Sequence, residues 1–324
     1  MLIAAVAIVA GFAILIWSAD LFITGAAAIA RNMGMSPIVI GMTIVSIGTS
    51  APEVLVSLTA SFAGAGELAV GNAIGSNIAN IGMVLGITLL VTPLLLRQST
   101  IKKELLLLLG TTALAGFMLA DARLSNTEGW LLIVMMVLMM TYILRDQQQD
   151  PTLQQETGEA PAPELPSTRA WLTFGAGLLL LIASSHLLVW GAIRSAELLG
   201  VPELLIGLTV IAVGTSLPEL AATITCALRG HTEIAIGNVI GSNLFNLLVV
   251  MAIPGIVSSQ TLAPQVLARD YTAMAFLTGV LAAVIYLGRW GKAAPAGHAY
   301  LGRLVGVLLV TMYALYYHRL YLSL

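Results

Sequence analysis

Charged residues are scarce in this sequence. Only 9% of the 324 residues are Asp, Glu, Lys or Arg, whereas 58% are apolar and the mean hydropathy is +0.96. A soluble domain carries about 25% charged residues, so this chain could not cover its own surface in water. The composition therefore excludes a soluble enzyme, a nucleic-acid-binding domain and a disordered protein, and it predicts that the chain lies in a lipid bilayer.

Cysteine and surplus positive charge are also nearly absent. The single cysteine, Cys226, excludes a disulfide framework and a metal site built from cysteines. A net charge of −2 offers no basic surface to a polyanion, so nucleic acid is not an expected partner. No charge occurs from Met1 to Trp17, whereas a signal peptide begins with a basic region. We therefore expect that stretch to remain in place as the first membrane helix.

Turn residues and charged residues divide the rest of the chain into apolar segments. A membrane-spanning helix needs about 20 apolar residues. Ten segments meet or approach that length: 2–30, 36–62, 68–94, 103–120, 126–144, 170–195, 202–228, 234–257, 271–288 and 299–318. The expected fold is an all-α polytopic membrane protein with about ten transmembrane helices.

One long polar stretch separates the fifth segment from the sixth. Residues 145–169 contain five acidic residues and four prolines, a composition typical of a flexible linker. This linker separates a first half, 1–144, from a second half, 170–324. If the N-terminus lies outside, ten Lys and Arg residues fall on the side of the linker and four on the other. Because positive charge favours the cytoplasmic side, we expect a cytoplasmic linker, both termini outside and a location in the inner membrane.

The two halves share an internal repeat. Residues 41–87 align without a gap to residues 207–253 at a constant offset of 166, and 20 of the 47 positions are identical. GMTIVSIGTSAPE corresponds to GLTVIAVGTSLPE, and AVGNAIGSNIANI corresponds to AIGNVIGSNLFNL. With five spans in each half, the second half must insert in the opposite orientation. Two inverted five-helix repeats are typical of transporters whose substrate site lies near the middle of the membrane.

Each repeat places one glutamate inside an apolar helix, Glu53 in the first and Glu219 in the second. A carboxylate at that depth is costly unless it is paired or coordinated, so it indicates a functional site. The alternative is a residue at a helix end, but apolar residues continue well beyond each glutamate. Hydroxyl side chains precede them on the same helices: Thr49, Ser50, Thr215 and Ser216. The threonines stand four residues before the glutamates and so share their helix face.

Proline and glycine predict a break in each of these two helices. Pro52 and Pro218 have no N–H, which frees the carbonyls of Gly48 and Gly214 four residues earlier. Irregular backbone is tolerated at membrane depth only where it is buried in protein or lines a cavity. We therefore expect loose backbone oxygens beside the two glutamates.

A second motif adds polar side chains at helical spacing. The stripes recur every four residues: Asn72, Ser76 and Asn80 in the first half, and Asn238, Ser242 and Asn246 in the second. Asn77 and Asn243 lie one position off these stripes and could instead bond broken backbone. A single stripe is more typical of hydrogen bonding between membrane helices. Two stripes that accompany two buried glutamates favour a binding site.

These oxygen-rich motifs favour a hard cation. Ca²⁺ takes about 6–8 oxygen ligands in irregular geometry, and two ionised glutamates neutralise its charge. Several Na⁺ ions could occupy the same oxygens in alternation. A transition metal would need His or Cys, which neither motif contains, and Mg²⁺ prefers to keep its waters in a strict octahedron. The expected substrates are Ca²⁺ and Na⁺, and no cofactor is expected.

The doubled motifs GTS-x-PE and GN-x-x-GSN-x-x-N resemble the two α-repeats of the cation/Ca²⁺ antiporter superfamily, specifically its prokaryotic Na⁺/Ca²⁺ exchangers. The resemblance covers essentially the whole chain. It implies that Ca²⁺ binds to Glu53, Glu219, Thr49 and Thr215. It implies Na⁺ contacts from Ser50, Ser76, Ser216 and Ser242, and from the backbone carbonyls of Ser46 and Ala212. It places Asn80 and Asn246 in the middle of the site.

Exchangers similar to this chain move three Na⁺ inward for one Ca²⁺ outward by alternating access, and their first and sixth helices slide over the remainder. The resemblance therefore implies a secondary antiporter rather than an enzyme. Three Na⁺ against one Ca²⁺ moves net charge, so we expect electrogenic exchange. The lipid bilayer is the expected surrounding, and no obligate protein partner is evident.

Two other functions stay open. A Ca²⁺/H⁺ antiporter is the first, although proton-coupled relatives typically have Glu where this chain has Gly75 and Gly241. An intramembrane hydrolase with a carboxylate dyad is the second, but it leaves the duplicated hydroxyl and amide oxygens unexplained. Asn246 is neutral where some relatives carry an acid, which disfavours K⁺ co-transport. Asp20 aligns with His186 at the same offset, and either residue could serve ion access or simply form hydrogen bonds.

Overall fold

Helices make up nearly all of the described chain, which comprises residues 1–149, 164–200, 212–287, 295 and 297–322 of a computed structural model. The α-helices of the first half are α1 (Leu2–Met33), α2 (Pro37–Ile40), α3 (Ser46–Thr49), α4 (Ala51–Phe62), α5 (Gly66–Ala79), α6 (Gly86–Val91), α7 (Gln98–Met118) and α8 (Asn126–Gln149). Those of the second half are α10 (Ser167–Leu198), α12 (Ala212–Thr215), α13 (Leu217–Leu228), α14 (Thr232–Phe245), α15 (Ala252–Val257), α16 (Thr272–Leu287) and α17 (Arg303–Leu322). The all-helical fold predicted from the apolar segments is confirmed.

The helices cross a membrane several times. Within the described ranges, seven are long and apolar enough to span a bilayer, and the bent pair Pro37–Thr49 and Ala51–Phe62 adds an eighth. Helices α12 and α13 hold the described part of the predicted segment 202–228, whose first residues lie outside the described chain. With α17, the helical segments number about ten, as expected. The central part of the predicted linker, 150–163, also lies outside the described residues.

The most deeply buried spans are those that carry the asparagine stripes. In the apolar 18-residue window of the continuous run Gly66–Val91, 78% of the residues are buried, and the figure for its counterpart Thr232–Val257 is 83%. The long helices α1 and α10 are each only 33% buried over their apolar window. The polar stripes therefore lie at the centre of the molecule, where lipid does not reach them.

Several spans contain π-helical turns, which are rare in proteins and frequent at functional sites. They are η1 (Gly41–Val45), η2 (Asn80–Leu85), η5 (Asn246–Val250) and η6 (Val266–Tyr271), and a short 3₁₀ turn, η3, covers Leu119–Asp121. Two of them start at equivalent positions of the repeat, η2 at Asn80 and η5 at Asn246. The repeat thus extends from sequence to local backbone geometry.

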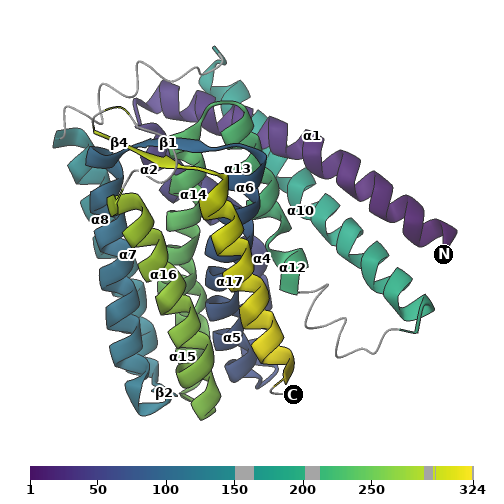
Figure 1. Ribbon diagram of the computed structural model, residues 1–324, viewed down its shortest axis with the longest axis vertical. Coiled ribbons are helices and arrows are strands. Elements are labelled where there is room, and N and C mark those ends of the chain that lie inside the picture. The colour runs from purple at the N-terminus through teal and green to yellow at the C-terminus, as the bar shows by residue number, and fades with distance from the viewer. Residues whose placement is uncertain (150–163, 201–211, 288–294, 296, 323–324) are drawn as a thin grey trace.

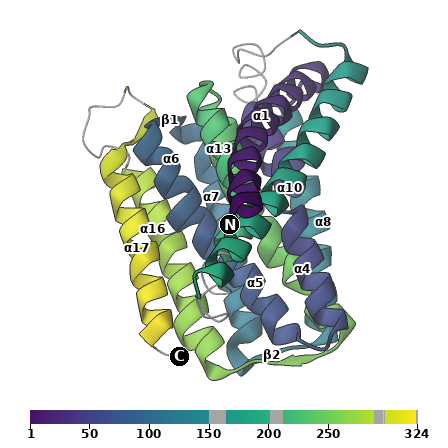
Figure 2. The same cartoon turned by 90° about the vertical axis from the view of Figure 1, so that its right-hand side faces the viewer.

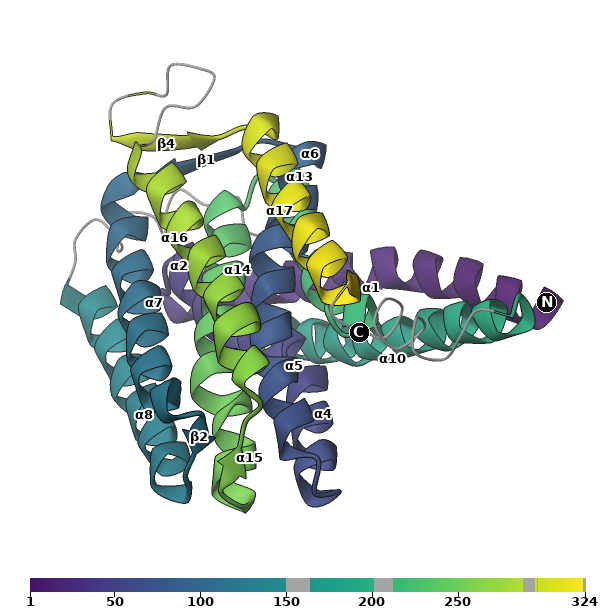
Figure 3. The same ribbon diagram turned by 60° about the horizontal axis from the view of Figure 1, so that its bottom comes forward.

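Helices α1 and α10 form a closely packed pair that leans away from the other helices (Figures 1 and 3). Glycines allow the contact, because a Cβ on Gly25 would lie 2.4 Å from the backbone nitrogen of Phe174. A Cβ on Gly177 would lie equally close to the nitrogen of Phe22. The two phenylalanine rings stack across the contact with centroids 4.8 Å apart. The two helices therefore pack backbone to backbone at these glycines.

Two short antiparallel ribbons, which the sequence did not predict, join the halves at opposite ends of the bundle (Figure 1). Strand β1 (Leu94–Arg97) pairs with β4 (His298–Leu301), so that Leu94 faces Leu301 and Arg97 faces His298. Strand β2 (Arg123–Leu124) pairs with β3 (Gln260–Thr261). Each ribbon contains one strand from each half, so it links the two halves at that end of the bundle.

The α1–α10 contact gives a direct test of this packing. We expect Gly177→Ala to lower the thermal stability of the purified protein, by about 1–3 kcal/mol, because an added methyl group forces two helix backbones apart. Gly175→Ala is the matched control, since a Cβ at Gly175 meets no atom within 4 Å. The measurement is the unfolding temperature in detergent. Equal unfolding temperatures for the two variants would contradict the close contact.

Candidate cation-binding site

The two glutamate-bearing helices are broken, as the proline and glycine pattern predicts. The break lies at Ser50, where α3 and α4 meet at 46°. Ser216 makes the corresponding junction between α12 and α13, with nearly the same backbone angles (φ −91°, ψ 7°, against φ −83°, ψ 9° at Ser50). Helices α4 and α13 therefore begin inside the protein rather than at its surface.

Each glutamate sits in the first turn of its half-helix. Glu53 is the third residue of α4 and Glu219 the third of α13, and each is only 1% exposed. The N-terminus of a helix carries partial positive charge, which stabilises a nearby carboxylate. The break thus places each charge at the favourable end of a dipole.

Hydroxyl groups from both repeats contact the carboxylates. The Oγ of Ser50, in the first repeat, donates to Oε1 of Glu219 at 3.1 Å. The Oγ of Ser76 donates to Oε1 of Glu53 at 3.5 Å. The Ser50 contact joins two residues 169 positions apart and crosses from one repeat to the other, so the two motifs form one site. The predicted convergence of these residues is therefore present in the geometry.

Several other oxygens of this cluster have no hydrogen-bond partner in the described chain. The unpartnered buried atoms include Oε2 of Glu53, Oε2 of Glu219, Oγ of Ser216, Oγ of Ser242, Oδ1 of Asn80 and Oδ1 of Asn246. A buried polar atom without a partner costs about 1–3 kcal/mol, so several in one region indicate a ligand. Among the described residues, no three or more His, Cys, Asp or Glu side chains lie together so that they could hold a metal ion. The donors are therefore two carboxylates and neutral oxygens, which suit Na⁺ and Ca²⁺.

Other predicted residues hold the frame of the site. Thr49 donates from Oγ1 to Oδ1 of Asn238 at 3.2 Å, and Asn238 donates from Nδ2 to Oγ1 of Thr223 at 3.0 Å. Asn72 donates to the backbone carbonyl of Glu53 at 3.1 Å. These side chains fix the glutamate helices against α5 and α14. The sequence analysis did not single out Thr223, although its repeat counterpart Ser57 also carries a hydroxyl.

Of the two asparagines that lie one position off the stripes, Asn77 bonds backbone. Asn77 donates to the backbone carbonyl of Asn243 at 3.2 Å, so it bonds backbone of the opposite repeat.

The other predicted site residues lie beside the two helix breaks. Thr215 is half-buried in α12. The carbonyl of Ser46 accepts bonds from the amide of Ser50 at 3.0 Å and from Thr49 Oγ1 at 3.4 Å. Ala212 begins α12, directly after residues outside the described chain.

Helix α10 contacts the second break through a residue that the sequence analysis missed. The Oγ of Ser185 donates to the carbonyl of Gly214 at 3.0 Å. That carbonyl is one of the two that proline was expected to free. At the offset of 166, the counterpart of Ser185 is Ala19, which has no hydroxyl. The two halves of the site therefore differ, and comparing residues across the repeat could have revealed the difference.

A charged contact joins α1 to the second repeat. Asp20 forms an ion pair with Arg229, at the end of α13, and Arg229 also donates to Thr24 Oγ1 at 2.9 Å. Asp20 is thus an ion-pair partner rather than a residue of the carboxylate cluster. The counterparts of Asp20 and Arg229 are His186 and Ala63, so the other repeat cannot form the same ion pair.

Comparison with known proteins agrees with this geometry. The family described as sodium/calcium exchanger protein matches residues 3–145 and 169–322. The putative antiporter CaxA of Alkalimonas amylolytica is 44% identical over 294 residues, which is 89% of this chain and 92% of that protein. Inner membrane protein YrbG of Escherichia coli (strain K12) is 36% identical and covers 99% of this chain and 98% of its own length.

A solved structure has the same fold. The sodium-calcium exchanger NCX_Mj, soaked with 2.5 mM Na⁺ and 0.1 mM Ca²⁺, superimposes with a TM-score of 0.79 at 28% identity, over 96% of both chains. The family match covers both repeats and nearly the whole of each half. This multi-pass membrane protein is therefore a transporter and not an enzyme. The chain belongs to the sodium/calcium exchanger protein family.

Proposed function

We propose that this protein exchanges Na⁺, moving inward, for Ca²⁺, moving outward, at the site formed by Glu53 and Glu219. The observation that carries the proposal is the cluster of unpartnered oxygens around two carboxylates that are each 1% exposed. The two negative charges match one Ca²⁺ in number. The serine and asparagine oxygens add neutral ligands, which a larger number of Na⁺ ions would also use.

The broken helices support transport rather than static binding. Each repeat brings one half-helix N-terminus to the centre of the molecule, as substrate sites of inverted-repeat transporters do. Alternating access then requires that the site open to one side at a time. We propose that α1 and α10, one from each of the two units 1–144 and 170–324, move together over the remaining helices of both units.

The packing around Gly241 supports proton coupling less well than it supports Na⁺ coupling. Proton-coupled relatives were expected to carry Glu at the positions of Gly75 and Gly241. A Cβ on Gly241 would lie 2.5 Å from the Cα of Met42 and 2.7 Å from the Oγ of Ser46, so a glutamate there would require the helices to separate. Gly75 has open space around it. The arrangement therefore favours Na⁺ as the coupling ion, and the first experiment below also tests proton coupling.

The glutamates give the central test. We expect Glu53→Gln and Glu219→Gln each to abolish Ca²⁺ transport, because each removes one of the two charges that face a divalent ion at low dielectric. Glu233→Gln is the control, since that glutamate lies in the first turn of α14 at the rim. The measurement is ⁴⁵Ca uptake into proteoliposomes under an outward Na⁺ gradient, with and without a proton ionophore. Near-normal uptake by either site variant would refute the proposed site, and uptake that needs a proton gradient would refute Na⁺ coupling.

We also propose an orientation in the inner membrane. Both termini lie outside and the linker lies in the cytoplasm, in keeping with the excess of positive residues on that side. The β1–β4 ribbon would then mark the cytoplasmic end and the β2–β3 ribbon the outer end. The name of YrbG as an inner membrane protein supports the location.

Cysteine labelling tests this orientation. A cysteine at Thr168, an exposed position at the start of α10, should resist a membrane-impermeant thiol reagent in intact spheroplasts and react in inverted vesicles. A cysteine at Ser259, exposed beside β3, should show the opposite pattern. The native Cys226 is buried and gives little background. Labelling of Thr168→Cys from the outside would reverse the orientation.

Coupling to voltage gives a further prediction. If more than two Na⁺ ions exchange for one Ca²⁺, an inside-negative potential should drive Ca²⁺ out, by about 2.3 kcal/mol per 100 mV for each net charge. Replacing Ser76 and Ser242 together with Ala should raise the Na⁺ concentration needed for exchange more than the Ca²⁺ concentration. Ser61→Ala is the control, because that buried serine only bonds the carbonyl of Ser57 within α4.

The measurement is Ca²⁺ flux in proteoliposomes whose potential is clamped with K⁺ and valinomycin, at several Na⁺ concentrations. Flux that responds neither to potential nor to Na⁺ would contradict electrogenic Na⁺ exchange. If the double variant needed proportionally more of both Na⁺ and Ca²⁺, Ser76 and Ser242 would not be specific ligands of Na⁺.

A further inference from the structure

A hollow of about 280 Å³ lies between α16 and α17, with its lining extending back to η6. These helices form one outer edge of the molecule, away from α1 and α10 (Figure 2). None of the residues that line the hollow belongs to the glutamate, serine and asparagine cluster. The hollow is therefore separate from the candidate cation site.

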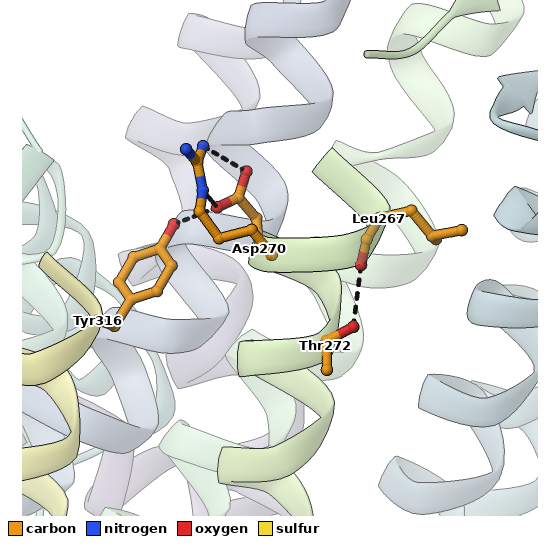
Figure 4. Close-up of polar contacts among 5 residues, drawn as sticks. Leu267, Asp270, Thr272 and Tyr316 are labelled. Atoms are coloured by element: carbon orange, nitrogen blue, oxygen red, sulfur yellow. Dashed lines mark hydrogen bonds and ion pairs between the residues drawn. The ribbon is translucent and has the colours of Figure 1, made fainter. Parts of the chain in front are cut away.

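Arginines line one end of this hollow, and Figure 4 shows the polar contacts made there by Asp270 and Tyr316. Arg269 donates from Nε to Oδ1 of Asp270 at 2.7 Å and from Nη2 to Oδ2 at 3.1 Å. Tyr316, on α17, donates from its hydroxyl to Oδ1 of the same carboxylate at 3.0 Å. These bonds satisfy Asp270 and hold Arg269 in place at the rim.

A second arginine, Arg319, lines the same hollow. Arg319, in the last turn of α17, is exposed, and within the described chain no carboxylate lies in ion-pair distance of it. Arg269, Asp270 and Arg319 together carry a net charge of about +1. An arginine at the end of a membrane helix extends toward the headgroup region, where phosphate is the available anion.

The other end of the hollow is apolar. Phe276 lies seven residues after Arg269 on one helix, and Met312 lies seven residues before Arg319 on the other. Helices α16 and α17 run in opposite directions (Figure 1), so both apolar residues lie about 10 Å deeper than the arginines. Phe276 is 65% exposed and Leu315 is 58% exposed, which leaves apolar surface open to the bilayer.

We propose that this hollow binds an anionic phospholipid, with its phosphate group at Arg319 and Arg269 and an acyl chain along Phe276 and Leu315. The net positive charge selects a lipid of net negative charge. The apolar end distinguishes a lipid from free phosphate, which could use only the arginines. The inference stands apart from the proposed ion exchange, since it concerns lipid binding by the resting protein.

The test compares lipids on the purified, delipidated full-length protein by native mass spectrometry. Phosphatidylglycerol should be retained in preference to phosphatidylcholine with the same acyl chains. Arg319→Gln should weaken retention of phosphatidylglycerol about fivefold, the effect of one interfacial cation on an anionic lipid. Arg319→Lys should retain the preference. Arg303→Gln, at the other end of α17, is the matched control and should bind as the unmodified protein does.

Three outcomes would overturn the proposal. Equal retention of phosphatidylglycerol and phosphatidylcholine would show that the hollow does not select lipids by charge. Equal loss in Arg319→Gln and Arg303→Gln would show a general effect of surface charge rather than a site. Displacement of phosphatidylglycerol by millimolar inorganic phosphate would show an anion site that makes no use of the acyl chain. Phe276→Ala should weaken phosphatidylglycerol binding, and unchanged binding by that variant would likewise exclude the apolar contact.

Discussion

The burial of two like charges at the centre of the molecule governs the rest of the structure. Glu53 and Glu219 are shielded from water, and Ser50, directly before the half-helix of Glu53, contacts Glu219, so like charges on the two carboxylates repel each other across the site. A low-dielectric interior strengthens that repulsion, so the fold must supply opposing partial charge. It does so with two interior helix N-termini and with the Ser50 and Ser76 hydroxyls. A cation between the carboxylates would relieve the remaining repulsion, which links stability of the site to its occupancy.

The need for interior helix ends in turn determines the surrounding architecture. A helix that stops inside a membrane exposes backbone groups that lipid cannot satisfy, so continuous helices must enclose the breaks. Here α5 with η2 and α14 with η5 provide that cover, and side chains close the remaining gaps. Asn72 holds the carbonyl of Glu53, and Ser185 holds the carbonyl of Gly214. The polar stripes thus serve the backbone as well as the cluster of oxygens.

Much of the fold and the centre of the site could be predicted from the sequence, because both repeat. The matched Glu53 and Glu219, the helix breaks beside them and the buried asparagines follow from local chemistry and from the constant offset. Contacts without a repeat counterpart could not be predicted. Ser185 and Arg229 find their partners only through the packing of α10 and α1, and the two ribbons pair strands from different halves. No local pattern marks these residues, since each depends on a neighbour far away in the chain.

The π-helical turns carry information about the history of the chain. A π-helical turn accommodates about one residue more than an α-helical turn. The turns η2 and η5 begin at Asn80 and Asn246, and the alignment of the two repeats runs through them without a gap. The extra residue therefore lies at the same place in both halves, and one insertion before the halves duplicated accounts for both turns more simply than two independent insertions.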